Sequence, residues 1–224
     1  MLKNTRTLET FFVFKVSYCT FAPVMRDKIL INATDLFLNY GFKSITMDDI
    51  SNHLGISKKT IYQHFENKTS LVEAVSLHVF ENISCGISEI RSIKKNPIEE
   101  IFDIKQFVME HLKDEKSSPQ YQLQKYYPKI FKTLKNKQFE VMQECVTDNL
   151  NRGMELELYR KTLDINFISR IYFHCMSILK DNELFPLKHF SMNTLMDNYL
   201  EYHLRGICTE KGLLTLTKFI NNQP

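Results

Sequence analysis

The sequence predicts an all-α protein in which a helix-turn-helix segment precedes a larger helical body. Glycine and proline are scarce, with six of each among 224 residues, and no alternating strand-like segments bounded by turn residues recur. Apolar residues recur instead at the spacing of helix faces. The apolar content of 43% is enough for a proper core in one large domain or two modest ones.

Residues 1–24 form an apolar leader whose run 11–24 follows basic residues, as in a signal peptide. Lys15 interrupts this run, which is also too short to span a bilayer. We therefore reject export as its role. We expect the leader to be disordered or not part of the natural product, with Met25 as the natural start.

The first expected helix covers residues 26–39 and braces the helices that follow. Its inward residues at helical spacing are Ile29, Ile31, Ala33, Leu36 and Phe37. Gly41 ends it, because glycine readily takes the backbone conformation found just after a helix.

Residues 46–65 are expected to form two short helices joined by a tight turn. Thr46 caps the first helix, and Asp49 three residues later completes a capping box. Gly55 can take the left-handed conformation that ends this helix, and Ser57 caps the next one. The pattern is typical of a helix-turn-helix.

The second of these helices turns Ile61 and Phe65 inward, and its other side chains point outward. The outward residues are Lys58, Lys59, Thr60, Tyr62, Gln63 and His64. None is acidic and each can donate a hydrogen bond, which suits a helix in the DNA major groove. An ordinary helical hairpin with a solvated basic side is the alternative interpretation.

Residues 26–71 resemble the DNA-binding segment of TetR-type transcriptional regulators. The matching stretches are Tyr40-Gly41-Phe42, residues 44–50, residues 55–65 and Asn67-Lys68. The resemblance implies that DNA is contacted by Lys58, Lys59, Thr60, Tyr62 and His64, with Thr46 and Lys68 holding phosphates. Many members have Gly or Pro where this chain has Lys59, a departure that bears on base preference. Members also begin shortly before the first helix, as a chain starting at Met25 does.

The resemblance further implies a three-helix DNA-binding domain over residues 25–70 and an effector-binding and dimerisation domain over residues 71–224. A fourth helix, expected over residues 68–90, carries an apolar stripe long enough to join the two. A fifth helix is expected to begin at Pro97 and a sixth to cover residues 121–127. The next is expected to run from residue 130 or 136 to 152, with Gly153 ending it. Two more are expected over residues 164–180 and 193–204. A short helix closes the chain.

The middle of the body is the expected place of a small-molecule pocket, because apolar bulk and a few polar tips gather there, as in ligand cavities. The candidates are Phe107, His111, Tyr121, Tyr126, Tyr127, Phe131, Phe139, Met142, Tyr172 and Met176. The alternative is that they are ordinary core and surface residues. His111 and Glu115 have the spacing of a metal pair, but a solvated ion pair is the favoured interpretation, and no metal site is expected.

The last third of the chain has the character of a subunit interface. Residues 164–180 carry apolar side chains over a wider face than one neighbouring helix needs, and a second apolar helix follows. In TetR-type regulators the last two long helices of each subunit form a four-helix dimer interface. The residues expected there are Ile165, Ile168, Tyr172, Cys175, Leu179, Leu195, Met196, Tyr199 and Leu200. A twofold dimer suits DNA with paired half-sites.

Composition and motifs limit the possible functions. The net charge of +3 is only mildly basic, so a DNA-binding surface must be local. Five scattered cysteines without a CxxC pair indicate reduced thiols in a cytoplasm rather than disulfides or a zinc finger. The chain has no GxSxG, HExxH, P-loop or dinucleotide motif, so we expect neither an enzyme nor a cofactor.

The combined expectation is a cytoplasmic homodimeric regulator, usually a repressor in the family it resembles. Its expected partners are a double-stranded DNA operator, a second copy of the chain and a small-molecule effector, and no membrane. A DNA-binding adaptor or architectural protein whose body binds a protein partner is the alternative.

Overall fold

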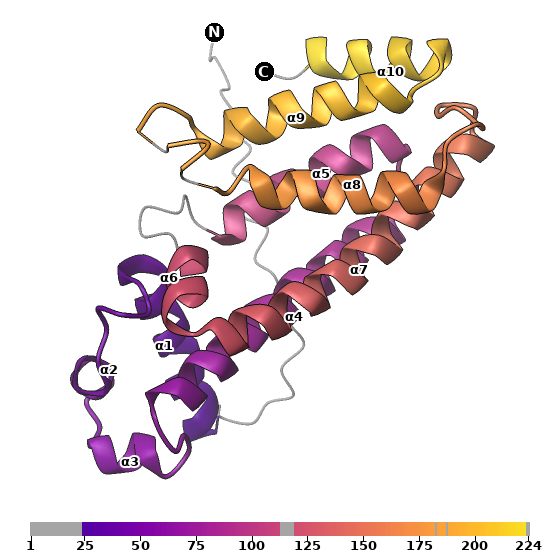
Figure 1. Cartoon of the computed structure of the whole chain (residues 1–224). Coiled ribbons are helices and arrows are strands. Elements are labelled where there is room, and N and C mark those ends of the chain that lie inside the picture. Colours follow the sequence, from indigo (N-terminus) through magenta and orange to yellow (C-terminus); the bar gives the residue numbers. More distant parts are fainter. Residues whose placement is uncertain (1–23, 113–118, 182, 187, 223–224) are drawn as a thin grey trace, which may run out of the picture.

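A computed structural model describes residues 24–112, 119–181, 183–186 and 188–222 (Figure 1). Residues 1–23 of the leader and Glu115 lie outside these ranges, so the structure does not test what the sequence predicts for them. Within them the chain forms ten helices and no strand, which confirms the all-α class.

The helices lie close to the ranges expected from the sequence. In chain order they are α1 (Met25–Tyr40), α2 (Met47–Leu54), α3 (Lys58–Tyr62), α4 (Lys68–Ser92), α5 (Pro97–Leu112), α6 (Pro119–Tyr126), α7 (Pro128–Glu155), α8 (Ile165–Ile178), α9 (Met192–Ile207) and α10 (Glu210–Asn221). Across the described ranges, no helix combines the length and the apolar character that crossing a membrane requires.

The first three helices form a head at one end of the molecule, and α4 leads out of it (Figure 1). The core of the head is shared with α4, and Leu123 of α6 and Ile130 of α7 belong to the same buried cluster. Ile29, Phe37, Ile50, Ile61 and Leu71 are fully buried there. The start of α4 is therefore held rigidly by the head, while its remaining turns belong to the body.

One inward assignment on α1 is wrong. Ile31 is 45% exposed, whereas Ile29, Ala33 and Phe37 are buried. These three repeat at the i, i+4 spacing that keeps side chains on one helix face, while position 31 lies about 200° around the helix from position 29.

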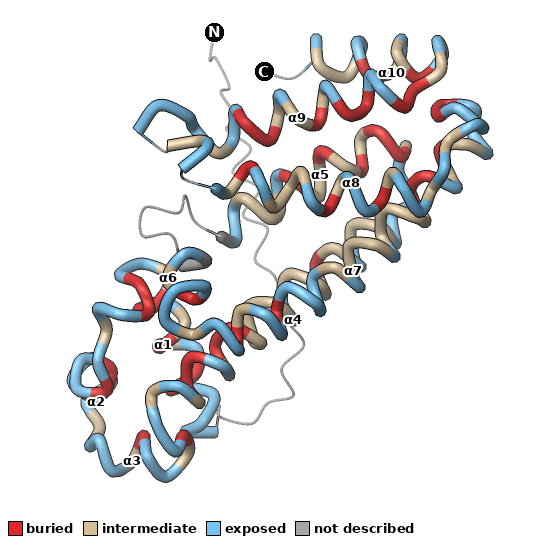
Figure 2. The backbone as a smooth tube through the Cα atoms, viewed as in Figure 1, coloured by how far each residue is buried: buried red, intermediate tan, exposed pale blue. Residues whose placement is uncertain are grey.

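The body is a layered bundle built around α4 and α7, which run side by side away from the head (Figure 1). Helices α5 and α8 pack against them, and α9 and α10 cover α5 on the side away from the head. Buried positions face the spaces between these layers in Figure 2. The core at this end includes Ile98, Leu150, Leu200, Leu204 and Leu216.

Gly153 does not end its helix, contrary to the sequence-based expectation, because α7 continues to Glu155. A Cβ atom at Gly153 would overlap the ring of Tyr159, so the glycine is required by a close approach rather than by a turn. The chain then folds back beside the end of α9, where the N–H of Arg160 donates to the carbonyl of Ile207 at 2.9 Å.

Candidate DNA-binding surface and ligand cavity

Short-range capping bonds shape the α2–α3 pair as the sequence predicts. The N–H of Thr46 donates to Asp49 Oδ2 at 2.7 Å, and the N–H of Asp49 donates back to Thr46 Oγ1 at 3.2 Å. Gly55 takes the left-handed conformation with φ 65°, and Ser57 Oγ accepts from the N–H of Thr60. The fold of this segment is therefore a helix-turn-helix.

The face of α3 that points away from the head core carries the residues assigned to DNA. Ile61 is fully buried, while Tyr62 is 47% exposed. Lys58 and Lys59 are exposed, and Thr60 and His64 are half-buried. The helix thus presents a basic, aromatic surface to solvent, of a shape that a major groove can accept.

An acidic residue of the neighbouring helix, missed in the sequence analysis, lies against this face. Lys58 Nζ donates to Asp48 Oδ2 at 2.8 Å, and both side chains are exposed. The bond raises the pKa of Lys58, so this lysine remains charged, but its charge is partly neutralised. No sequence pattern signals the pair, because the partners belong to different helices.

The two residues assigned to phosphates are already engaged within the head. Lys68 Nζ donates to the carbonyl of Lys43 at 3.2 Å and lies 5.9 Å from the Phe37 ring centre. Burial lowers the pKa of Lys68. Thr46 Oγ1 donates to Asp49 Oδ2 at 2.7 Å. Both side chains help to fold the head, and phosphate contact would require these bonds to rearrange or be shared.

Aromatic and polar contacts join the head to α6 of the body. Lys43 Nζ donates to the hydroxyl of Tyr126 at 3.3 Å and lies 4.7 Å from the centre of its ring. The rings of Phe42 and Tyr127 meet edge to face at 6.5 Å. The loop after α1 is therefore held by the body as well as by the head.

A cavity of about 270 Å³ lies inside the body, mainly between α4, α5, α7 and α8. It reaches Leu38 and Phe42 at the head end, and His203 and Ile207 of α9 at the other end. Of the residues predicted for a pocket, Phe131, Met142, Tyr172 and Met176 line it. Its volume lies near the lower end of the range for small-ligand pockets.

The other candidates for the pocket do not line this cavity. Phe107 fills the space beside Gly86, and its ring lies 4.0 Å from that of His111, which is exposed. Tyr121 and Tyr126 are exposed on α6. Tyr127 packs toward the head, and Phe139 packs against Phe173 at 5.1 Å. Helix rotation, which composition does not reveal, turns these side chains away.

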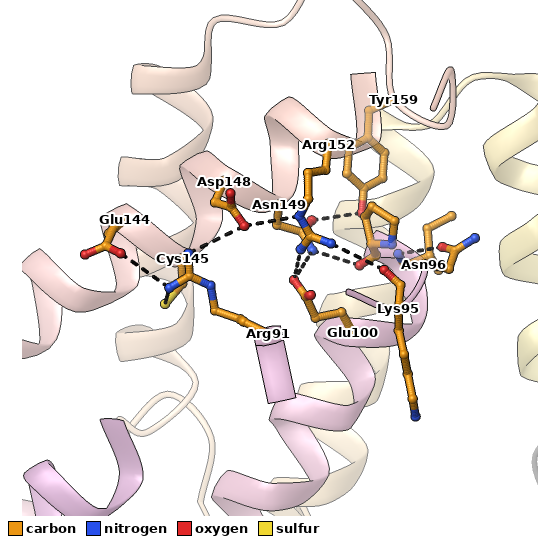
Figure 3. Close-up of polar contacts among 12 residues, drawn as sticks. Arg91, Lys95, Asn96, Glu100, Glu144, Cys145, Asp148, Asn149, Arg152 and Tyr159 are labelled. Carbon is orange, nitrogen blue, oxygen red and sulfur yellow. Dashed lines mark hydrogen bonds and ion pairs between the residues drawn. The ribbon is translucent and has the colours of Figure 1, made fainter. Parts of the chain in front are cut away.

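A buried polar network closes the cavity wall near the end of α7 (Figure 3). Glu100 is 1% exposed and pairs through Oε1 with Arg152 Nη2 and, at 2.9 Å, with Asn149 Nδ2. Asn149 also donates to the carbonyl of Pro97 and accepts from the hydroxyl of Tyr159. The sequence analysis missed this network, because charged residues on amphipathic helices are usually solvated.

Two rings at the α9 side of the cavity are held in their uncharged forms. Burial lowers the pKa of His203 to about 4 and raises that of Tyr172. Their ring centres lie 5.1 Å apart. At neutral pH this part of the wall therefore carries no net charge.

The dimer-interface prediction needs correction on α9 and at the end of α8. Leu179, Leu195, Met196 and Leu200 are buried within their own protomer, so a partner cannot cover them. Leu179, Leu195 and Met196 form one buried cluster, and Leu200 belongs to the buried cluster that includes Ile98 of α5. Ile165, Ile168, Tyr172, Cys175 and Tyr199 are half-buried.

Large apolar side chains on the opposite side of the same helices remain exposed. They are Phe167, Ile171 and Ile178 on α8 and Tyr202 on α9. Phe167 is 60% exposed and Tyr202 is 77% exposed. These residues, rather than the buried ones, are available to a partner.

The part of the chain that the structure describes contains no group of three or more His, Cys, Asp or Glu side chains that could hold a metal ion. The proposed partner of His111, Glu115, lies outside that part. No metal ligand set is therefore assigned.

Sequence comparison relates the head to known regulators. A family model described as "Bacterial regulatory proteins, tetR family" matches residues 29–75. The HTH-type transcriptional activator FasR of Mycolicibacterium smegmatis is 34% identical over 64 residues, which are 29% of this chain and 29% of FasR. The biofilm operon negative transcriptional regulator IcaR of Staphylococcus aureus is 43% identical over 49 residues, 22% of this chain and 26% of IcaR. The matches thus span less than a third of these curated relatives.

Structural comparison extends the likeness of fold to the body. The ketosteroid transcriptional regulator KstR2 of Mycobacterium tuberculosis aligns with a TM-score of 0.56 at 19% identity, covering 85% of this chain and 98% of KstR2. SmeT, the repressor of a Stenotrophomonas maltophilia multidrug efflux pump, aligns with a TM-score of 0.64 at 15% identity, covering 84% and 92%. At these identities the comparison supports the fold alone.

Proposed function

We propose that this chain, whose residues 29–75 match the family model of the TetR-type bacterial regulatory proteins, is a homodimeric transcriptional repressor that a small-molecule effector releases from its operator. In this proposal residues 25–70 bind DNA, and residues 71–224 bind the effector and the second subunit. The protein acts on DNA in the cytoplasm and has no enzymatic activity.

The observation that carries the proposal is the orientation of α3. Burial of Ile61 against the head core directs Lys59 and Tyr62 to solvent, with Lys58 beside them. Lysines can neutralise phosphates, and tyrosine can reach both phosphate oxygens and base edges. We assign the same surface to Thr60 and His64, with Thr46 and Lys68 at its border.

Repression is proposed in preference to activation because of the head sequence. The IcaR segment, from a protein named as a negative regulator, is 43% identical, and the FasR segment, from a protein named as an activator, is 34% identical. A repressor needs only to occupy its site, whereas an activator needs an additional surface for the transcription machinery.

The effector response is proposed to pass through α4. This helix begins in the head core at Leu71 and lines the cavity at Val79, Ile83 and Ile87. A ligand that prefers one arrangement of α4 shifts the population toward that arrangement. In a dimer, the spacing of the two heads then no longer fits both half-sites.

Dimerisation is proposed through the exposed side of α8 and α9. Phe167, Ile171, Ile178 and Tyr202 are large apolar residues that a monomer leaves in water. A second copy would cover them, and apolar burial is the main favourable term in such interfaces.

Fluorescence anisotropy with DNA fragments from beside the gene tests the proposal, with competitor DNA present and at two salt concentrations. Tight, competitor-resistant binding to one short near-palindrome is expected. Tyr62→Ala should abolish it and leave the helix content and the dimer intact, as judged by circular dichroism and sedimentation. Binding of equal strength to every fragment, with a steep salt dependence, would refute a specific regulator.

A further inference from the structure

Two lysines lie at the entrance of the cavity in the body. Lys135 of α7 and Lys180, two residues after the end of α8, both line the cavity. Lys135 is exposed and Lys180 is half-buried, so each reaches both the cavity and the solvent. A lysine in such a position lays its apolar stem along the wall and keeps its ammonium group in water. The entrance of the cavity is therefore positively charged.

The fold brings these two lysines to the same end of the α7–α8 pair. The two helices run in opposite directions, with α7 leading away from the head and α8 running back (Figure 1). The rings of Phe139 in α7 and Phe173 in α8 meet at 5.1 Å. Lys135 lies about one turn before Phe139. Lys180 lies about two turns after Phe173, so both lysines lie on the same side of this contact.

The charge of the two lysines is not neutralised by the described part of the protein. Neither forms an ion pair with an acidic side chain of the described ranges. The other charged groups of the lining are paired. Lys105 Nζ lies 2.9 Å from Asp197, and Glu100 pairs with Arg152. An anion is the ligand group that the remaining positive charge favours.

Glu100 lies too far from these lysines to repel an anion bound beside them. Asn149, which bonds to Glu100 at 2.9 Å, follows Lys135 by fourteen residues on α7. That separation is about 21 Å along the helix, and charges so far apart are largely screened at physiological ionic strength. Glu100 Oε2 and Ser76 Oγ lack hydrogen-bond partners, but both atoms are buried and offer a ligand no accessible polar contact.

The wall between the two ends of the cavity is apolar and the space is narrow. Val79 of α4, Ile104 of α5 and Met142 of α7 line it. The lining follows α7 from Lys135 to Leu150, which is about 22 Å along the helix. A volume of about 270 Å³ is small for that length. The shape suits one extended apolar chain better than a fused ring system.

We propose that the cavity binds a single-chain amphiphile with an anionic head group, of which an ionised fatty acid is the simplest, with the head group at Lys135 and Lys180 and the chain along α7. This inference rests on the proposed effector site and names its ligand class. Because the head group stays at the entrance, it keeps part of its hydration, and mainly the apolar chain is desolvated.

Three probes of equal chain length test the ligand class on the full-length protein without DNA. They are octanoate, 1-octanol and octylammonium, measured by isothermal titration calorimetry at two salt concentrations. Octanoate should bind about fivefold more tightly than 1-octanol, because two partly exposed lysines favour the anion, and octylammonium should bind most weakly. Added salt should weaken only octanoate. Equal affinities, or weakest binding of octanoate, would overturn the proposal without the use of any variant.

A double variant makes the test specific to the entrance. Lys135→Gln combined with Lys180→Gln should remove the advantage of octanoate and leave the affinity for 1-octanol unchanged, which also reports an intact cavity. Lys135→Glu combined with Lys180→Glu should invert the preference, so that octylammonium binds more tightly than octanoate. An unchanged preference for octanoate in either folded variant would refute the assignment of the head group to these lysines.

A matched control separates the entrance from the net charge of the protein. Lys137→Gln combined with Lys188→Gln removes the same charge from two exposed lysines outside the cavity lining. This protein should keep the preference for octanoate. The same loss of preference in the control as in the entrance variant would mean that net charge is responsible, and it would overturn the proposal.

Operator release separates this inference from the proposed function. If octanoate binds with the expected dependence on the two lysines but leaves the operator complex intact, the ligand class is supported and the effector response is refuted. If the operator complex forms and none of the probes binds, the ligand class is refuted and DNA binding stands.

Discussion

The main-chain N–H of Lys43, in the loop after α1, donates a hydrogen bond of 2.8 Å to Oε1 of Gln122 in α6. The approach depends on Gly41, because a Cβ atom there would overlap the amide of Gln122. Gly41 also has φ 88°, a conformation that other residues rarely adopt. One side chain of the body thus holds the loop between the first two helices of the head.

Removal of the Gln122 side chain should loosen this loop. In Gln122→Ala the amide of Lys43 loses its acceptor, and its hydrogen exchange should become about tenfold faster. Exchange measured by NMR on the free protein checks this. Gln124→Ala, an exposed position on the same helix, should leave the rate unchanged. Equal rates in both variants would mean that the bond does not hold the loop.

Asp48 should weaken DNA binding through its ion pair with Lys58. In Asp48→Asn the lysine is freed for phosphate, so operator affinity should rise about two- to fivefold. The salt dependence should also become steeper. Anisotropy titrations at several salt concentrations measure both quantities. Asp27→Asn, which removes an exposed acid from α1, controls for net charge. A loss of affinity specific to Asp48→Asn would contradict the prediction.

The free energy of unfolding should decrease as the pH is lowered, because His203 is buried in its neutral form. Burial lowers the pKa of His203 in the folded protein to about 4, below the ordinary histidine value of 6.5, so the unfolded chain takes up the proton first as pH falls. The contribution is fully present above pH 6.5 and is lost toward pH 4, by roughly 2 kcal/mol at pH 5.

Urea unfolding at pH 7 and pH 5 measures this effect. His203→Gln should lose less stability than the wild type between these pH values, because its side chain does not titrate. His189→Gln, at an exposed position, should behave as the wild type does. The same loss in all three proteins would show that His203 has an ordinary pKa.

Replacement by alanine should change the stability of the protein in opposite directions at two helical glycines, Gly153 and Gly206. Gly153→Ala places a methyl group against the Tyr159 ring and should cost about 1–3 kcal/mol. Gly206→Ala meets no atom within 4 Å and should stabilise α9 by about 0.5–1 kcal/mol. Urea midpoints of the two variants check the signs. A gain in stability at Gly153 would mean that Tyr159 can move aside at little cost.

The head was largely predictable from the sequence because its decisive interactions are local. The Thr46–Asp49 capping box and the cap at Ser57 each join residues only three positions apart. Gly55 acts through its own backbone freedom. Such effects depend on neighbouring residues, so they survive in any tertiary context that keeps the two helices.

The cavity was only partly predictable, because composition does not reveal how far a helix is rotated. Met142 and Tyr172 line it, whereas Phe139 on the same helix as Met142 packs against Phe173 instead. The difference lies in the direction of each side chain, and neighbouring helices set that direction.

Local sequence patterns were enough to predict the all-α class, the helix-turn-helix and the order of the helices, because helical periodicity and capping depend on residues only a few positions apart. The contacts between residues far apart in the chain could not be predicted in this way. Glu100 and Arg152 form an ion pair although they are 52 positions apart in the sequence. Leu200 is buried in the core of its own protomer and is not available to a partner subunit. These outcomes depend on how amphipathic helices pack, and many packings share one pattern of apolar residues.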